Sequence, residues 1–186
     1  MKSNTCLLLV YAFAKRISEY ADDSFVYHVH NASHNKFFDL LDCAAGFIRA
    51  SSPPVNLLVN LWKELDKLHP PHVKFFHVCH SQGSLETRNS LEFLPKSIRE
   101  RIIVLAIAPA TIIPKKMCHR SFNYATRLDI VPYIDLYNRI RYRKQITILK
   151  SHSSVSPWMD HSFNSPTYDK PIKDRLTEYL QNYGDN

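Results

Sequence analysis

Hydrophobic and polar positions divide the chain into alternating strand-like and helix-like segments. Apolar residues recur at i, i+3/i+4 and i+7 over residues 55–68, which predicts a helix with Leu57, Leu58, Leu61, Trp62, Leu65 and Leu68 on its apolar face. The unbroken apolar run at 102–107 predicts a strand covered on both faces of a parallel sheet. Other strands are expected at 25–30, 73–78, 122–126 and 145–150, and other helices at 37–48, 82–93 and 169–183.

This alternation is typical of a three-layer α/β fold, in which right-handed crossovers place helices on both faces of the sheet. No linker or internal repeat divides the sequence, so a single domain is expected over residues 1–186. Residues 1–24 form a helical segment in this interpretation. The apolar run at 6–11 also fits a short signal peptide, but the helical spacing of its apolar residues favours a buried helix and a cytoplasmic protein over a secreted one.

Composition narrows the class of protein. The chain has 186 residues, of which 45% are hydrophobic and 22% charged, and this excludes collagen-like, coiled-coil and disordered proteins. Its four cysteines are far apart and form no CxxC pair, which argues against a disulfide scaffold or a zinc ribbon. Only three glycines occur where average usage would give roughly 13, so each invites a reason in backbone geometry.

The charge balance is basic, with a formal net charge of +7. The most concentrated positive stretch contains Arg139, Arg141, Arg143 and Lys144, and it could meet an anionic lipid surface or nucleic acid. A solvated face beside a charged edge strand is the simpler interpretation. No RNA-binding signature surrounds the stretch, so no specific nucleic-acid partner is expected.

The segment His-Val-Cys-His-Ser-Gln-Gly-Ser at residues 77–84 lies between a predicted strand and a predicted helix. A serine on such a turn is exposed above the sheet at a helix N-terminus, so Ser81 is the candidate nucleophile. Small residues are needed two positions to either side, and Cys79 and Gly83 occupy those positions. The alternative is that Ser81 only caps the helix. His80 is expected to be a packing or hydrogen-bonding neighbour.

A nucleophilic serine needs a base and an acid that orients the base. Asp129 follows the strand at 122–126 and is the candidate acid, although it could instead pair with Arg127 or cap a turn. Asp135 lies farther from that strand and is expected at the surface. His161 lies between the last strand and the last helix and is the candidate base, with His152 in the same loop as second choice.

Backbone amides are expected to hold the developing negative charge. Gln82 directly follows the nucleophile, and Asn31 begins a small polar loop, residues 31–35, after the first strand; an ordinary Asx turn explains that loop equally well. A metal site is a weaker alternative: His28 and His30 alternate on a strand, but no recognised ligand spacing completes the set.

With these residues assigned, the chain resembles the α/β-hydrolase superfamily, in its lipase and esterase-like branch. More closely, residues 26–168 are similar to an uncharacterised family of chlamydial proteins. The shared patterns lie at residues 30–34, 79–83 (C-H-S-Q-G), 101–109, 128–132 (D-x-V-P) and 160–168 (D-H-S-F-N-S-P-T-Y). Asn35 stands where that family tends to have glycine, and Leu128 where it tends to have arginine. The resemblance implies a hydrolase-like core with a reduced, mostly parallel sheet of about five strands.

The sequence therefore predicts a serine hydrolase of an ester or acyl bond, acting on a small-molecule ester or a lipid without a cofactor. A catalytically silent hydrolase-like protein that binds a partner through its basic surface is the alternative, because a chain of 186 residues leaves little room for pocket-forming loops.

Overall fold

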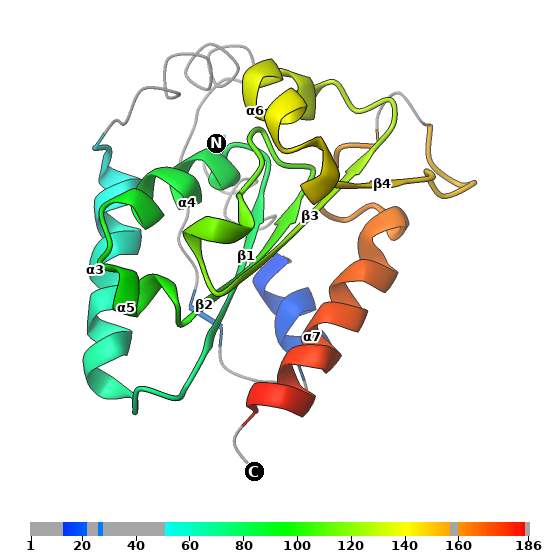
Figure 1. Ribbon diagram of the computed structural model, residues 1–186. Helices are drawn as coiled ribbons and strands as arrows, with labels where there is room; N and C mark the ends of the chain where they lie inside the picture. Colours follow the sequence, from blue (N-terminus) through cyan, green and yellow to red (C-terminus); the bar gives the residue numbers. More distant parts are fainter. Residues whose placement is uncertain (1–12, 22–25, 28–50, 157–159, 185–186) are drawn as a thin grey trace, which may run out of the picture.

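The computed structural model describes residues 13–21, 26–27, 51–156 and 160–184 (Figure 1). Its sheet has four parallel strands in the order β1-β2-β3-β4, so each strand pairs with the next one in the chain. The strands are β1 (Phe75–His80), β2 (Ile102–Ile107), β3 (Arg120–Thr126) and β4 (Thr147–Leu149). The predicted α/β class is confirmed. The strand expected at 25–30 and the helix expected at 37–48 lie largely or wholly outside the described residues.

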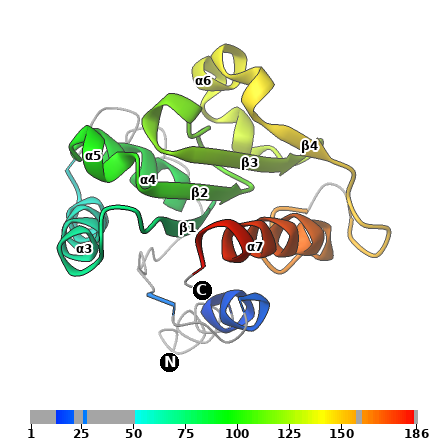
Figure 2. The same cartoon turned by 60° about the horizontal axis from the view of Figure 1, so that its bottom comes forward.

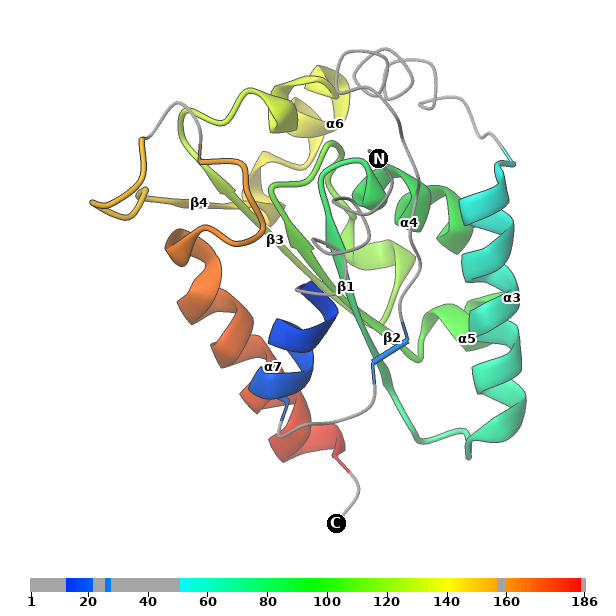
Figure 3. The same cartoon turned by 180° about the vertical axis from the view of Figure 1, so that it is seen from behind.

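Helices cover both faces of this sheet. On one face lie α3 (Pro53–Leu68), α4 (Gly83–Glu92) and the short α5 (Lys96–Arg99). On the other face, α7 (Asp169–Tyr183) lies beside a helix over residues 13–20 (Figures 2 and 3). A short helix, α6 (Leu136–Arg141), connects β3 to β4. Single 3₁₀ turns occur at Lys115–Met117, Val131–Tyr133, Arg143–Gln145 and Pro166–Tyr168.

The alternation of side chains along β2 explains why the fold has two cores. Ile102, Val104 and Ala106 join a cluster that includes Trp62 and other residues of α3. Leu105 and Ile107 point to the opposite face and join a cluster with Ile172 and other residues of α7. Every residue of β2 is buried, as the unbroken apolar run predicted.

Local signals account for the ends of α3 and for its buried face. The Ser52 side chain accepts a hydrogen bond from Val55 N (3.5 Å), and prolines occupy the first turn, where their missing N–H costs nothing. The buried stripe is Val55, Leu58, Val59 and Trp62. Leu57 and Leu68, expected on the apolar face, are 53% and 72% exposed, because they fall outside that stripe.

α7 begins at Asp169, as predicted, with Tyr168 in the N-cap position. The Asp169 carboxylate accepts a hydrogen bond from Tyr20 Oη (2.9 Å) and forms an ion pair with Arg16. These contacts join the helix over residues 13–20 to α7. Ile17 of that helix is buried, whereas the apolar run at 6–11 lies outside the described residues.

No described helix is long and apolar enough to cross a membrane.

Candidate active site

Ser81 occupies the turn between β1 and α4 in a strained backbone conformation. Its φ is 53°, a left-handed value that few residues other than glycine adopt. Neighbouring groups hold this geometry: Ser81 N donates to Ile107 O (3.2 Å), while Ser81 O accepts from Ala110 N (3.1 Å) and Ser84 Oγ (2.7 Å). This sharp strand-to-helix turn presents the hydroxyl at the start of a helix, as the motif predicted.

Cys79 and Gly83 flank this turn and lie next to each other. Cys79 is buried against the helix, and burial raises the pKa of its thiol to about 12, so it is not a thiolate at neutral pH. A Cβ built on Gly83 would lie 3.8 Å from Cβ of Cys79, an ordinary van der Waals distance. This distance is compatible with the small residue expected at 83, and the unusual backbone angle falls on Ser81.

His161 connects Ser81 to Asp129. Its Nε2 lies 2.9 Å from Ser81 Oγ, and its Nδ1 lies 2.7 Å from Asp129 Oδ2. A carboxylate can only accept, so Nδ1 carries the proton that it donates to Asp129. Nε2 is then free to accept the proton of the Ser81 hydroxyl. The structure brings together the three residues that the sequence selected, from the ends of three elements.

Asp129 is fixed in the position that this contact requires. Its side chain is only 1% exposed, and its Oδ1 accepts a hydrogen bond from Val131 N (3.0 Å) in the 3₁₀ turn that follows. The alternative partner Arg127 forms no ion pair with Asp129 among the described side chains. One carboxylate oxygen therefore anchors the acid while the other orients the imidazole.

The loop that carries His161 is held from two sides. His80 Nε2 donates to the backbone oxygen of His161 (2.7 Å), and Asp160 O accepts from Thr126 Oγ1 (3.3 Å). Asp160 is fully buried, and its Oδ2 accepts from Thr167 Oγ1 (2.7 Å). The second-choice base, His152, is exposed and contacts Ser154 instead of Ser81. His80 is thus a hydrogen-bonding neighbour, as expected, and it positions the base.

His80 lies against His161, with the ring centroids 4.9 Å apart. Burial, aided by His161, lowers the pKa of His80 to about 4, so the ring is neutral at pH 7. A neutral neighbour does not repel the positive charge that His161 would acquire on taking a proton. His77, on the opposite face of β1, also has its pKa lowered to about 4 by burial, and its Nε2 donates to Thr87 Oγ1 (2.9 Å), whose own proton goes to Gly83 O.

Acid is expected to destabilise the protein through these two histidines. Between pH 6.5 and 4 the unfolded chain binds protons at both rings while the fold does not, so the free energy of unfolding falls as the pH falls through this window. The fall is at most about 1.4 kcal/mol per pH unit for each ring. Urea denaturation at pH 7.5 and 5.5 measures it. His77→Asn should reduce the pH dependence of the free energy of unfolding. An equal reduction in the exposed control His152→Asn would contradict the assignment.

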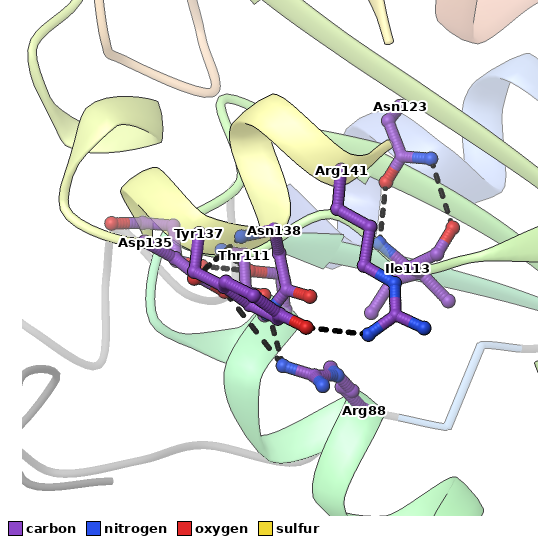
Figure 4. Close-up of polar contacts among 10 residues, drawn as sticks. Arg88, Thr111, Ile113, Asn123, Asp135, Tyr137, Asn138 and Arg141 are labelled. Carbon is purple, nitrogen blue, oxygen red and sulfur yellow. Dashed lines mark hydrogen bonds and ion pairs between the residues drawn. The ribbon is translucent and has the colours of Figure 1, made fainter. Parts of the chain in front are cut away.

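Asp135 is buried, which corrects the expectation that it lies at the surface. Its Oδ2 accepts from Thr111 Oγ1 (2.5 Å) and Asn138 Nδ2 (2.6 Å), and Arg88 Nη1 lies 3.7 Å away (Figure 4). Thr111 N in turn donates to Ser84 Oγ (3.1 Å), the group that holds Ser81 O. Asp135 is therefore no partner of His161: it anchors the β2–β3 connection that supports the nucleophile turn.

The same connection is anchored a second time at Ile113. The Asn123 side chain of β3 accepts from Ile113 N (2.9 Å) and donates to Ile113 O (3.1 Å), which satisfies both backbone groups (Figure 4). Neither Asn123 nor Thr111 was selected from the sequence. β3 contains several polar residues, so nothing in the sequence indicated that Asn123 in particular is buried and bonded to the backbone.

One of the two amides proposed for the oxyanion is in place. Gln82 is the N-cap residue of α4, and its backbone N–H makes no hydrogen bond to another described residue. This amide lies at the N-terminal end of α4, where the helix dipole is positive, directly after Ser81 in the chain. Asn31, the other candidate, and the loop 31–35 lie outside the described residues.

Metal ligands do not gather at this site. The described residues contain no group of three or more histidine, cysteine or acidic side chains placed to hold an ion. His28 and His30, the residues of the metal hypothesis, lie outside the described residues.

Comparisons with known proteins found no relative of this chain. A scan against protein-family models matched none, and searches of curated proteins and of solved structures gave no significant match.

Proposed function

We propose that this protein is a serine hydrolase that cleaves an ester or acyl bond, built on an α/β-hydrolase-like fold. The observation that carries the proposal is the continuous hydrogen-bonded connection Ser81–His161–Asp129, at 2.9 and 2.7 Å. The order along the chain, serine, then acid, then histidine, and the placement of each residue after a separate parallel strand are those of α/β-hydrolases.

The proposed reaction has two halves, acylation of Ser81 and hydrolysis of the acyl-enzyme, and the same groups act in both. Ser81 Oγ bonds to the carbonyl carbon while His161 Nε2 takes its proton, and the carbonyl electron pair moves onto oxygen. The Gln82 amide and the N-terminus of α4 stabilise that negative charge. His161 then gives the proton to the leaving alcohol as the carbon–oxygen bond breaks. Water attacks the acyl-enzyme in the same way, which releases the acid and restores Ser81.

Labelling with a fluorophosphonate tests this proposal. Ser81 Oγ should displace fluoride from phosphorus, and intact-protein mass spectrometry should find one adduct per chain. Ser81→Ala should abolish the adduct, whereas Ser97→Ala, an exposed serine on α5, should keep it. A folded protein that forms no adduct would favour the silent, partner-binding alternative, and an adduct that persists after Ser81→Ala would show that Ser81 is not the nucleophile.

A further inference from the structure

The helix α6 turns its polar side inward and its apolar side outward. Asp135 and Asn138 are buried, with 7% and 5% of their surface exposed; Asn138 donates to Asp135, which also accepts from Thr111 Oγ1 (Figure 4). In contrast, Leu136, Tyr137 and Ile140 are 56%, 66% and 61% exposed. A helix on a protein surface normally has the reverse arrangement, because burying apolar side chains stabilises it. The exposed apolar side chains of α6 are therefore suited to contact an apolar partner.

The turn before α6 extends this apolar area. Ile130 is 71% exposed and Tyr133 45% exposed, and the Arg139 guanidinium lies 4.9 Å from the centroid of the Tyr133 ring, so helix and turn pack together. We call the exposed apolar residues of this region, with the basic residues beside them, the α6 surface: Ile130, Tyr133, Leu136, Tyr137, Ile140, Arg139, Arg141, Arg143 and Lys144. Exposed apolar side chains gathered in this way commonly mark an interaction site.

Positive charge borders the apolar residues. Arg141, Arg143 and Lys144 are exposed, and no described acidic side chain forms an ion pair with any of them. Arg141 Nη1 donates to Tyr137 Oη (2.6 Å), which holds a cation over the apolar area. By contrast, several exposed lysines elsewhere, Lys67, Lys96 and Lys170, are paired with carboxylates. The α6 surface thus combines exposed apolar area with uncompensated positive charge.

We propose that the α6 surface docks the protein on an anionic lipid bilayer. Leu136, Ile140 and Ile130 enter the boundary of the acyl chains, the tyrosines lie at the headgroup level, and the three exposed cations meet lipid phosphates. An anionic membrane can contact both the apolar side chains and the cations of the α6 surface, since its acyl chains lie beneath negatively charged headgroups. Ile130 directly follows Asp129, so docking brings the triad to the membrane. Resting on the proposed function, this makes the substrate an acyl ester held in that membrane.

Vesicle sedimentation tests the docking. The full chain carrying Ser81→Ala, which cannot hydrolyse the lipid, should bind phosphatidylglycerol/phosphatidylcholine vesicles and bind pure phosphatidylcholine far less. Removing three cations together (Arg141→Gln, Arg143→Gln, Lys144→Gln) should weaken partitioning on the order of 100-fold. Leu136→Ser with Ile140→Ser should weaken it by at least about 10-fold. Binding should also decline as the salt concentration rises.

Matched controls remove the same chemistry elsewhere. Lys67→Gln, Lys96→Gln and Lys170→Gln remove three charges, and Leu57→Ser with Leu68→Ser removes two exposed leucines; both should bind like the parent. Equal losses in the controls, or equal binding to both kinds of vesicle, would overturn the docking proposal. So would a concentration-dependent dimer, seen by sedimentation velocity and lost in Leu136→Ser/Ile140→Ser, in a chain that binds no vesicle; that result assigns the surface to a second copy.

The two proposals fail in different ways. If the otherwise wild-type chain loses hydrolysis of vesicle esters after the triple cation change but keeps hydrolysis of a short soluble ester, docking and function both stand. If vesicle binding fails while the fluorophosphonate adduct forms, only the docking proposal is wrong. If vesicle binding is selective but no adduct forms, the hydrolase proposal is wrong and the α6 surface remains a membrane-binding site.

Discussion

Replacing His161 with alanine is expected to lower kcat/KM for a soluble ester by at least about 10⁴-fold. The imidazole is the only described group within hydrogen-bond distance of Ser81 Oγ that can take its proton, at 2.9 Å. Without it the hydroxyl remains a weak nucleophile at neutral pH. Steady-state hydrolysis of a p-nitrophenyl ester measures the loss, with circular dichroism and thermal unfolding to verify the fold.

The double variant sharpens this prediction. Ser81 and His161 act as one unit, so Ser81→Ala/His161→Ala should be no slower than either single variant. His152→Ala, in the same loop, is the matched control and should retain the wild-type rate. If the His161→Ala and His152→Ala variants hydrolyse the ester equally fast, His161 is not the base.

Asp129→Asn is expected to lower kcat by about 10⁴-fold while the protein remains folded. An asparagine amide can donate to Nδ1 of His161, which moves the imidazole proton to Nε2. The ring then cannot accept from Ser81, although the side chains keep nearly the same size. Because the Asp129 side chain is 1% exposed, water cannot readily replace its contact with Nδ1.

A stopped-flow measurement of acylation, compared with the wild type over pH 5 to 9, tests this explanation. The substitution should slow acylation itself rather than substrate binding, so kcat should fall with little change in KM. Asp174→Asn, at an exposed carboxylate of α7 that pairs with Lys170, is the control for removing a negative charge. An Asp129→Asn variant with wild-type acylation would show that the acid does not set the tautomer.

The sequence was sufficient to predict the residues of the site that can be chosen from their chemical type and their order along the chain. Ser81, Asp129 and His161 were selectable because each comes after a segment predicted to be a strand, and parallel strands bring their carboxyl ends to one edge of the sheet. β2 was predictable to the residue because burial on both faces leaves no polar position in the run. The boundaries of weaker strands shifted by a few residues.

The parts that the sequence could not predict depend on contacts between distant segments. The polar cap and outward leucine of α6 give no amphipathic pattern that points to the core, so neither the helix nor the burial of Asp135 was expected. Asp135 is stable there because Thr111 and Asn138 hydrogen-bond its carboxylate, and Thr111 lies in another loop. The partner of His80 was equally unpredictable, since its acceptor is the backbone oxygen of His161.

The sequential order of the strands has a consequence for how the protein folds. Since each strand pairs with its successor, the sheet can grow by adding one strand at a time, with short loop closures at each step. The contact between Ser81 and His161 spans 80 residues and requires β4 and the loop after it to be in place. Reactivity at Ser81 should therefore emerge late in refolding, after the β1–β2 pair has formed. The reactivity of this serine thus reports when the whole fold has formed.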